Sequence, residues 1–168
     1  MRIFHQANHF FKQGRFAAAE AAYSLAGRLD PGFAYARIMR QLTRLRQGEP
    51  ADWRPDARIA KLEPWASALL DFLAGRIGET GLFARLEPQG GLRYSEEECE
   101  LYFVLAEVQL SRGEIAEARR SLRSCLGTGI TSFVEYVMAW HELQRLDVDH
   151  PPPVLRKSAN EDADDQPV

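Results

Sequence analysis

The fold is decided by residues 8–31, which read NHFFKQGRFAAAEAAYSLAGRLDP. They predict a helix that ends at Gly14, because glycine adopts the left-handed conformation that closes a helix at low cost. A second helix follows, whose apolar side chains recur at intervals of three and four: Phe16, Ala19, Tyr23 and Ala26. Pro31 stops it, since the residue before a proline is pushed out of the helical region. The stretch is therefore a helix–turn–helix unit.

A looser copy of this unit occupies residues 99–125, CELYFVLAEVQLSRGEIAEARRSLRSC. We interpret four glycines as closing the first helix of successive pairs: Gly14, Gly48, Gly78 and Gly113. Their spacings are 34, 30 and 35 residues. A period near 34 with helix–turn–helix content is typical of tetratricopeptide (TPR) repeats. The sequence thus predicts about four helix pairs.

The rest of the chain predicts helices and no strands. We expect helices over residues 3–13, 16–29, 33–47, 55–62, 64–75, 80–86, 95–112, 114–126 and 132–146. Two capping boxes, Ser95-x-x-Glu98 and Ser132-x-x-Glu135, are expected to begin helices. The three arginines on one side of residues 33–47 are expected to form a solvated face: Arg37, Arg40 and Arg44. The predicted class is all-α, with a helical repeat domain over residues 1–146.

Charge divides the chain into a body and a tail. The chain has 21 basic and 24 acidic residues, a net charge of −3. Residues 147–168 carry six acids against two bases, and removing that −4 leaves the body near +1. This balance argues against a general nucleic-acid binder, which has a marked basic excess. The tail is poor in apolar residues and predicts disorder.

The two cysteines, Cys99 and Cys125, each lie in an apolar helical pattern. They are expected to be reduced and half-buried, and a disulfide between paired helices is the alternative. The first fifteen residues contain no apolar run of signal-peptide length, and no run approaches the 18 to 20 or so residues that span a bilayer. We therefore expect a cytoplasmic protein without membrane insertion.

The residues of the first unit resemble the TPR family. They place small, aromatic, glycine and proline residues where that motif has them: Ala7, Phe10, Gly14, Phe16, Ala19, Tyr23, Ala26 and Pro31. The last unit fits at Tyr102, Leu105, Ala106, Gly113, Ala118 and Leu122, but Gln109 and Ile130 replace the expected aromatic and proline. The resemblance implies a TPR-like α-solenoid of about four helix pairs plus a C-terminal capping helix, and a role in protein binding.

Residues 65–86 and 98–143 resemble the C-terminal half of bacterial cell-envelope TPR adaptor lipoproteins. The FVEY segment at residues 133–136, which follows a two-helix repeat, is the most characteristic piece. Members of that group recruit a periplasmic tail-specific protease and peptidoglycan hydrolases. This sequence shows neither a signal peptide nor a lipid-acceptor cysteine, so we do not extend envelope location or protease recruitment to it.

TPR stacks generally bind peptides in a concave groove lined by the first helix of each pair. The resemblance assigns that lining to ten residues: Phe4, Asn8, Phe11, Lys12, Met39, Thr43, Arg46, Phe103, Glu107 and Leu110. For each aromatic residue, packing in the core is an equal alternative. The mixed lining favours an apolar helix or extended peptide as ligand. Some TPR proteins hold the terminal carboxylate of a peptide with lysine and asparagine side chains. This mode is disfavoured here, because Phe4 stands where a basic residue is expected.

No stretch predicts catalysis, a cofactor or a metal site. His5 and His9 are one helical turn apart, but no third ligand of suitable spacing follows. His141-Glu142 begins like the HExxH motif of zinc proteases, yet Arg145 stands where the second histidine would be. The acidic run at residues 96–100 is interpreted as the start of a helix, where acidic side chains interact favourably with the helix dipole, rather than as a cation site.

The sequence therefore predicts a non-catalytic scaffold or adaptor that binds a peptide or helix of a partner protein. A regulatory or accessory subunit of an enzyme complex is the alternative. A small hydrolase with an unrecognised site is disfavoured. Self-association through exposed repeat ends is left open, and we expect neither nucleic acid nor a membrane as partner.

Overall fold

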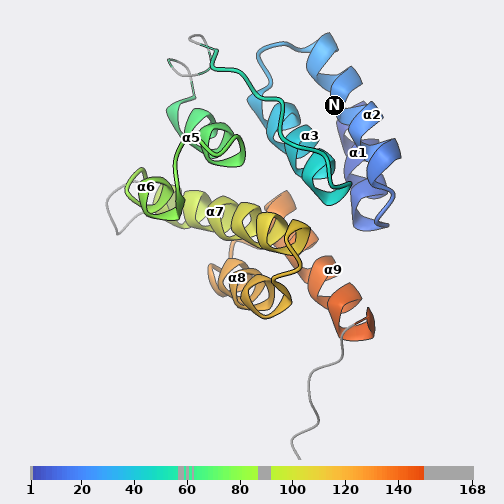
Figure 1. The fold of residues 1–168 in the computed structure, drawn as a ribbon, viewed down its shortest axis with the longest axis vertical. Coiled ribbons are helices and arrows are strands. Elements are labelled where there is room, and N and C mark those ends of the chain that lie inside the picture. The colour runs from blue at the N-terminus through green and yellow to red at the C-terminus, as the bar shows by residue number, and fades with distance from the viewer. Residues whose placement is uncertain (1, 57–58, 60, 62, 87–91, 150–168) are drawn as a thin grey trace, which may run out of the picture.

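The computed structural model describes residues 2–56, 59, 61, 63–86 and 92–149 (Figure 1). Within these residues the chain is all-α, with eight helices and no strand. The helices are α1 (Arg2–Lys12), α2 (Phe16–Leu29), α3 (Ala34–Arg46), α5 (Pro64–Leu73), α6 (Glu79–Phe83), α7 (Leu92–Ser111), α8 (Ile115–Gly127) and α9 (Val134–Asp149). No helix of this part of the chain is both long and apolar enough to cross a bilayer.

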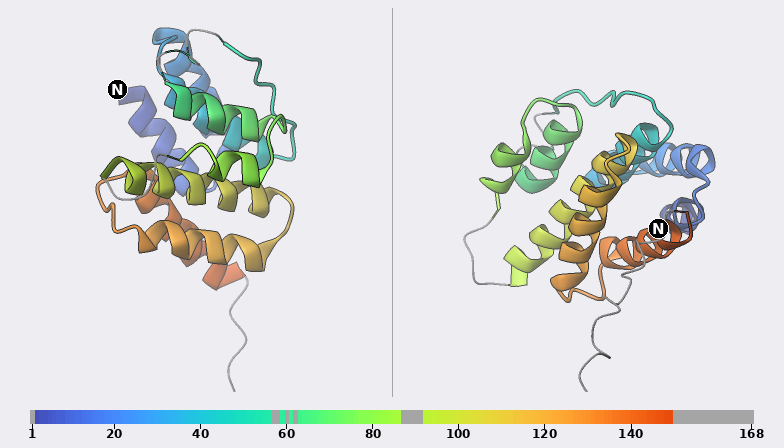
Figure 2. Two further views of the ribbon diagram at one scale, coloured as in Figure 1. Left: turned by 90° about the vertical axis from the view of Figure 1, so that its left-hand side faces the viewer. Right: turned by 60° about the horizontal axis from the view of Figure 1, so that its bottom comes forward.

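The helices form two hairpins joined through α3 and closed by α9. Helices α1 and α2 form the first hairpin, α7 and α8 form the second, and α3 packs against α2, α5 and α7. Helix α9 packs against α8 and α7 and also contacts α1, so the first and last helices lie side by side (Figure 2). The first and last helices thereby enclose a common interior.

The interior is one apolar cluster that connects the two hairpins. Phe11 of α1 and Phe103 of α7 are fully buried, with ring centroids 6.2 Å apart. Tyr23 of α2 is also fully buried, and its hydroxyl donates a hydrogen bond to Asn8 Oδ1 at 2.7 Å. A buried hydroxyl needs such a partner, because an unpaired one costs free energy.

Three of the four predicted turn glycines have the expected conformation. Gly14, Gly48 and Gly113 follow α1, α3 and α7 with φ of 71°, 77° and 76°. The prediction for Gly78 is wrong, because it precedes α6 with φ −88° and ψ 179°. The left-handed glycine that follows α5 is Gly75, with φ 71°. With Gly75 in place of Gly78 the spacings become 34, 27 and 38 residues, so the second is shorter and the third longer than predicted.

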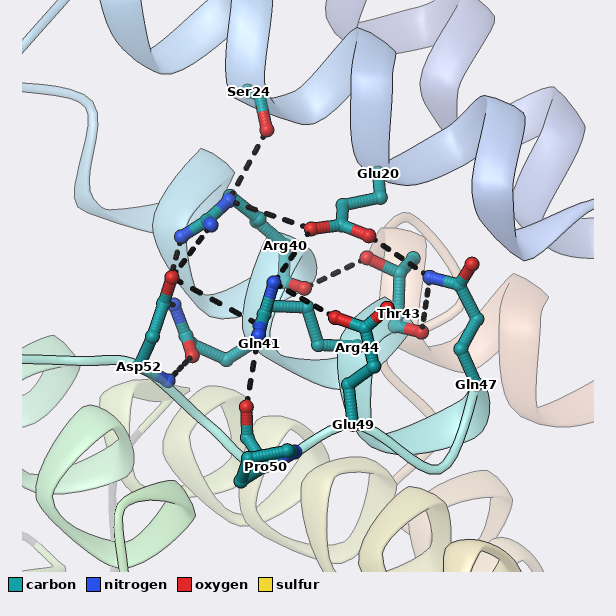
Figure 3. A network of polar contacts seen from close by, with 10 residues as sticks. All are labelled: Glu20, Ser24, Arg40, Gln41, Thr43, Arg44, Gln47, Glu49, Pro50 and Asp52. Carbon is teal, nitrogen blue, oxygen red and sulfur yellow. Dashed lines mark hydrogen bonds and ion pairs between the residues drawn. The ribbon is translucent and has the colours of Figure 1, made fainter.

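The chain after α3 departs from a regular helix pair. Of the helix predicted over 55–62, residues 59 and 61 are helical, 55 and 56 are not, and the other four lie outside the described residues. Residues 51–56 contain no helix. This segment is held against α3 instead: Arg40 donates to both carboxylate oxygens of Asp52 at 2.8 and 2.7 Å, and the Asp52 backbone N–H donates to Gln41 Oε1 at 2.8 Å (Figure 3). Side-chain pairing with α3 therefore fixes Asp52 and its neighbours.

The predicted solvated arginine face on α3 is accordingly wrong. The side chains of Arg37, Arg40 and Arg44 are only 25%, 29% and 18% exposed. Arg44 pairs with Glu20 of α2 at 3.2 Å and with Glu49 at 2.9 Å. The arginines are covered because α2 lies on one side of them and residues 49–56 lie on the other.

Two predicted boundaries also shift. Helix α7 includes Leu92, so Ser95 lies inside the helix rather than at its cap. Helix α9 continues to Asp149, three residues beyond the predicted end of the repeat domain. Asp147 pairs with Arg119 of α8, which ties the start of the predicted tail to the folded body. The rest of that tail, residues 150–168, lies outside the described residues.

Candidate partner-binding surfaces

The structure places most of the ten predicted groove residues in the interior. Seven are buried, with at most 8% of their surface exposed: Phe4, Asn8, Phe11, Met39, Thr43, Phe103 and Glu107. Three are partly exposed: Lys12, Arg46 and Leu110. A partner that approaches this conformation can therefore reach only a few of them. Their assignment to partner binding stays a prediction.

An ion-pair cluster joins α3, α7 and α9 within this interior. Arg46 Nη1 lies 2.6 Å from Glu107 Oε2 and 3.3 Å from Glu142 Oε2, and Arg145 pairs with the other oxygen of Glu142. The two carboxylate side chains are 0% and 1% exposed. Removing one partner of such a buried pair is costly, because the remaining charge is left without compensation. The cluster therefore holds α9 against α3 and α7.

Phe16 and Gly14 complete this cluster at the first hairpin turn. The guanidinium carbons of Arg46 and Arg145 lie 4.6 and 5.6 Å from the centroid of the Phe16 ring. Gly14 lies so near that an added Cβ would be 2.7 Å from Arg145 Nη1. Burial lowers the pKa of Arg145, and the neighbouring Arg46 lowers it further. Sequence reasoning missed this cluster, because its members are far apart in the chain.

An apolar pocket opens between the start of α1, the end of α2 and the start of α3. Its volume is about 690 Å³. It is lined by Arg2, Ile3, Phe4, His5, Ala26, Leu29, Asp30 and Phe33. The Phe4 and Phe33 rings meet edge to face, with centroids 4.8 Å apart. Leu29 is 68% exposed beside them. This volume is of the size that binds an organic ligand or side chains of a partner.

A second groove runs between α1 and the first turns of α9. Its volume is about 390 Å³, and its lining is basic, polar and apolar, with no acidic residue among those described: His5, Asn8, His9, Lys12, Ser132, Phe133, Val134, Val137 and Met138. Trp140 of α9 is 49% exposed. Burial lowers the pKa of His141, and the nearby cations Lys12 and Arg145 lower it further. The groove and the apolar pocket share His5.

The arginine network on α3 also lines a cavity, of about 380 Å³. Its charges are paired internally: Arg40 and then Gln41 donate hydrogen bonds to Asp52, and this lowers the pKa of Asp52 to about 2. Among the described residues, the buried Trp53 indole N–H has no hydrogen-bond partner. Because the guanidinium groups already pair with carboxylates, this network holds residues 49–56 in place rather than providing cations for a ligand.

Glu100 is the most perturbed carboxyl group near the acidic run on α7. Burial raises its pKa to about 7, although Trp65 Nε1 donates a hydrogen bond to it at 2.6 Å. Glu97 is buried and pairs with Arg93 at 3.2 Å. No group of three or more potential metal ligands occurs among the described residues. We find no nucleophile and base in hydrogen-bond contact at Glu100 in the described part of the chain.

The surfaces that remain accessible differ from the predicted groove. Leu29, Val137 and Trp140 were not among the predicted residues, and their sequence signal was weak because each looks like an ordinary member of an apolar helical stripe. No protein-family model matches this chain, and a comparison with curated proteins found no relative. The resemblance to TPR proteins therefore stays a prediction.

Proposed function

We propose that this chain is a non-catalytic scaffold of the TPR type, which binds an apolar helix or extended peptide of a partner protein. One observation carries the proposal: an apolar pocket of about 690 Å³ lies between α1, α2 and α3, with Leu29 exposed at it. Leu29 is 68% exposed beside this pocket, and burying it under a partner would lower the free energy of the complex.

The partner's course follows from the way the surfaces connect. His5 belongs to both the apolar pocket and the groove between α1 and α9, so a bound segment can continue from one to the other along α1. In the groove, Val137 offers an apolar contact and Lys12 a positive charge. The partner would therefore place an apolar side chain in the pocket and an acidic residue near Lys12.

The experiment compares two leucines that are equally exposed but lie in different places. Leu29 is 68% exposed at the pocket, and Leu92 is 69% exposed at the start of α7. The full chain is used as bait in native extract, with Leu29→Asp and Leu92→Asp as variants and quantitative mass spectrometry as readout. We expect Leu29→Asp to lose a partner that Leu92→Asp retains.

Equal retention or equal loss by the two variants contradicts the proposal, provided both melt like the wild type. Phe11→Ala, the substitution that the predicted groove suggests, is unsuitable here. Phe11 is 0% exposed, so its truncation leaves a cavity in the interior and tests stability rather than binding.

A further inference from the structure

Two thiols face one another between α7 and α8. Cys99 and Cys125 are both free and fully buried, and their sulfur atoms lie 3.5 Å apart. The bond length of a disulfide is about 2.05 Å, so the sulfur atoms need to approach by about 1.5 Å, which small side-chain rotations supply. The two cysteines lie 26 residues apart in the chain, on opposite sides of the turn at Gly113.

The surroundings make the two thiols unequal. The contact between the two thiols lowers the pKa of Cys99, and the neighbouring Thr128 side chain and Tyr136 backbone act in the same direction, against burial and Glu100. The pKa of Cys125 is raised by its hydrogen bond to Cys99 and by burial. Cys99 is therefore the better nucleophile of the pair, because the thiolate is the reactive form.

We propose that Cys99 and Cys125 form an oxidation site, at which a peroxide converts the two thiols into a disulfide that joins α7 to α8. In the first step the Cys99 thiolate attacks one peroxide oxygen and the O–O bond breaks. Cys99 becomes a sulfenic acid, and the second oxygen leaves as hydroxide or alkoxide and takes up a proton.

In the second step the Cys125 sulfur attacks the Cys99 sulfur. The S–S bond forms while the sulfenic oxygen leaves as water with the thiol proton of Cys125. The two thiols together lose two electrons, and the peroxide gains them. A dithiol reductant reverses the change by thiol–disulfide exchange.

Burial determines when this reaction occurs. Both sulfur atoms are covered by α7, α8 and the start of α9, so a peroxide reaches Cys99 only when these helices separate locally. The reaction is therefore slower than that of an exposed thiol and accelerates as the protein approaches its melting midpoint. Once formed, the disulfide closes the loop over the α7–α8 turn and opposes the same opening. This inference is independent of the proposed function.

The test uses the full-length protein with hydrogen peroxide, incubated just below its melting midpoint. We expect a product lighter by two hydrogen atoms, which dithiothreitol returns to the original mass. After alkylation in denaturant, the peptide map shows residues 99 and 125 in one cross-linked peptide and separates this change from methionine oxidation. The oxidised protein melts at a higher temperature than the reduced protein.

Single variants test the order of the two steps. In Cys125→Ser, Cys99 accumulates sulfenic acid that dimedone traps, whereas in Cys99→Ser residue 125 is trapped several-fold more slowly. The wild-type mass measurement stands even where a variant fails to fold. The proposal is overturned by unchanged cysteines after this incubation, by sulfinic or sulfonic acids without a cross-link, or by equal trapping in two folded variants.

Discussion

The two hairpins have the same turn but satisfy their buried polar groups in different ways. Counted from Gly14 and Gly113, Asn8 corresponds to Glu107 and Tyr23 corresponds to Leu122. In the first hairpin the Tyr23 hydroxyl donates to Asn8, so the pair is satisfied within the hairpin. In the second hairpin leucine offers no such donor, and Glu107 binds Arg46 of α3 instead.

This difference explains how the two hairpins are joined. A hairpin with internally paired polar groups has no electrostatic requirement for a neighbour, whereas a buried carboxylate without a local partner requires a cation from another element. Arg46 supplies that cation and also contacts Glu142 of α9. The second hairpin is therefore the one whose fully buried carboxylate depends on a cation from another helix.

The largest expected effect comes from Arg46→Ala. The substitution leaves the buried Glu107 carboxylate without its guanidinium partner, and it removes one of the two arginine contacts of Glu142. Breaking a buried pair from one side typically costs about 3 kcal/mol of unfolding free energy. Urea denaturation followed by circular dichroism measures this loss.

The matched control is Arg46→Met combined with Glu107→Leu, which removes both charges and keeps the volume. We expect this double variant to lose much less stability than Arg46→Ala, because no charge is left uncompensated at residue 107. Equal losses in the two proteins would show that packing around Arg46, rather than its charge, joins the hairpins.

The sequence predicted the features that depend on neighbouring residues. The α1–α2 and α7–α8 hairpins and the left-handed glycines after α1, α3 and α7 follow from apolar spacing and from the freedom of glycine. The missed features depend on distant residues. Arg46 and Glu142 are 96 positions apart, and no local pattern indicates their pairing. The predicted groove residues were assigned from register alone, which does not show that α9 packs against α1 and α7.

An intermediate effect on the unfolding free energy is expected from the ionisation of Glu135. This residue lies where α9 begins, beside the second hairpin. Its side chain is buried, and burial raises its pKa to about 7. The folded state therefore holds a proton that the unfolded state releases near its ordinary pKa of about 4.3, so stability falls as pH rises between these values. Between pH 5 and pH 7.5 this carboxyl group should reduce the unfolding free energy by about 2 kcal/mol.

Glu135→Gln tests this assignment, because glutamine keeps the shape and does not ionise. We expect the stability of the variant relative to the wild type to be about 2 kcal/mol more favourable at pH 7.5 than at pH 5, as measured by urea unfolding at both values. The Asp52 carboxyl group, whose pKa is about 2, stays ionised over this range and does not disturb the comparison. A difference between variant and wild type that is independent of pH would assign the effect to packing.

The smallest expected effect distinguishes the two turns themselves. Gly14 and Gly113 have φ of 71° and 76°, so alanine at either position costs about 1 kcal/mol through backbone strain. The surroundings differ: a Cβ at Gly113 meets nothing within 4 Å, whereas one at Gly14 lies 2.7 Å from Arg145 Nη1. Arg145 must then shift away from Glu142 and Phe16.

Gly14→Ala should therefore cost about 1 kcal/mol more than Gly113→Ala in thermal and urea unfolding. Adding Arg145→Ala to both variants should remove the difference. A difference that persists without Arg145 would place its cause in the first turn alone, and α9 would then have no energetic connection to that turn.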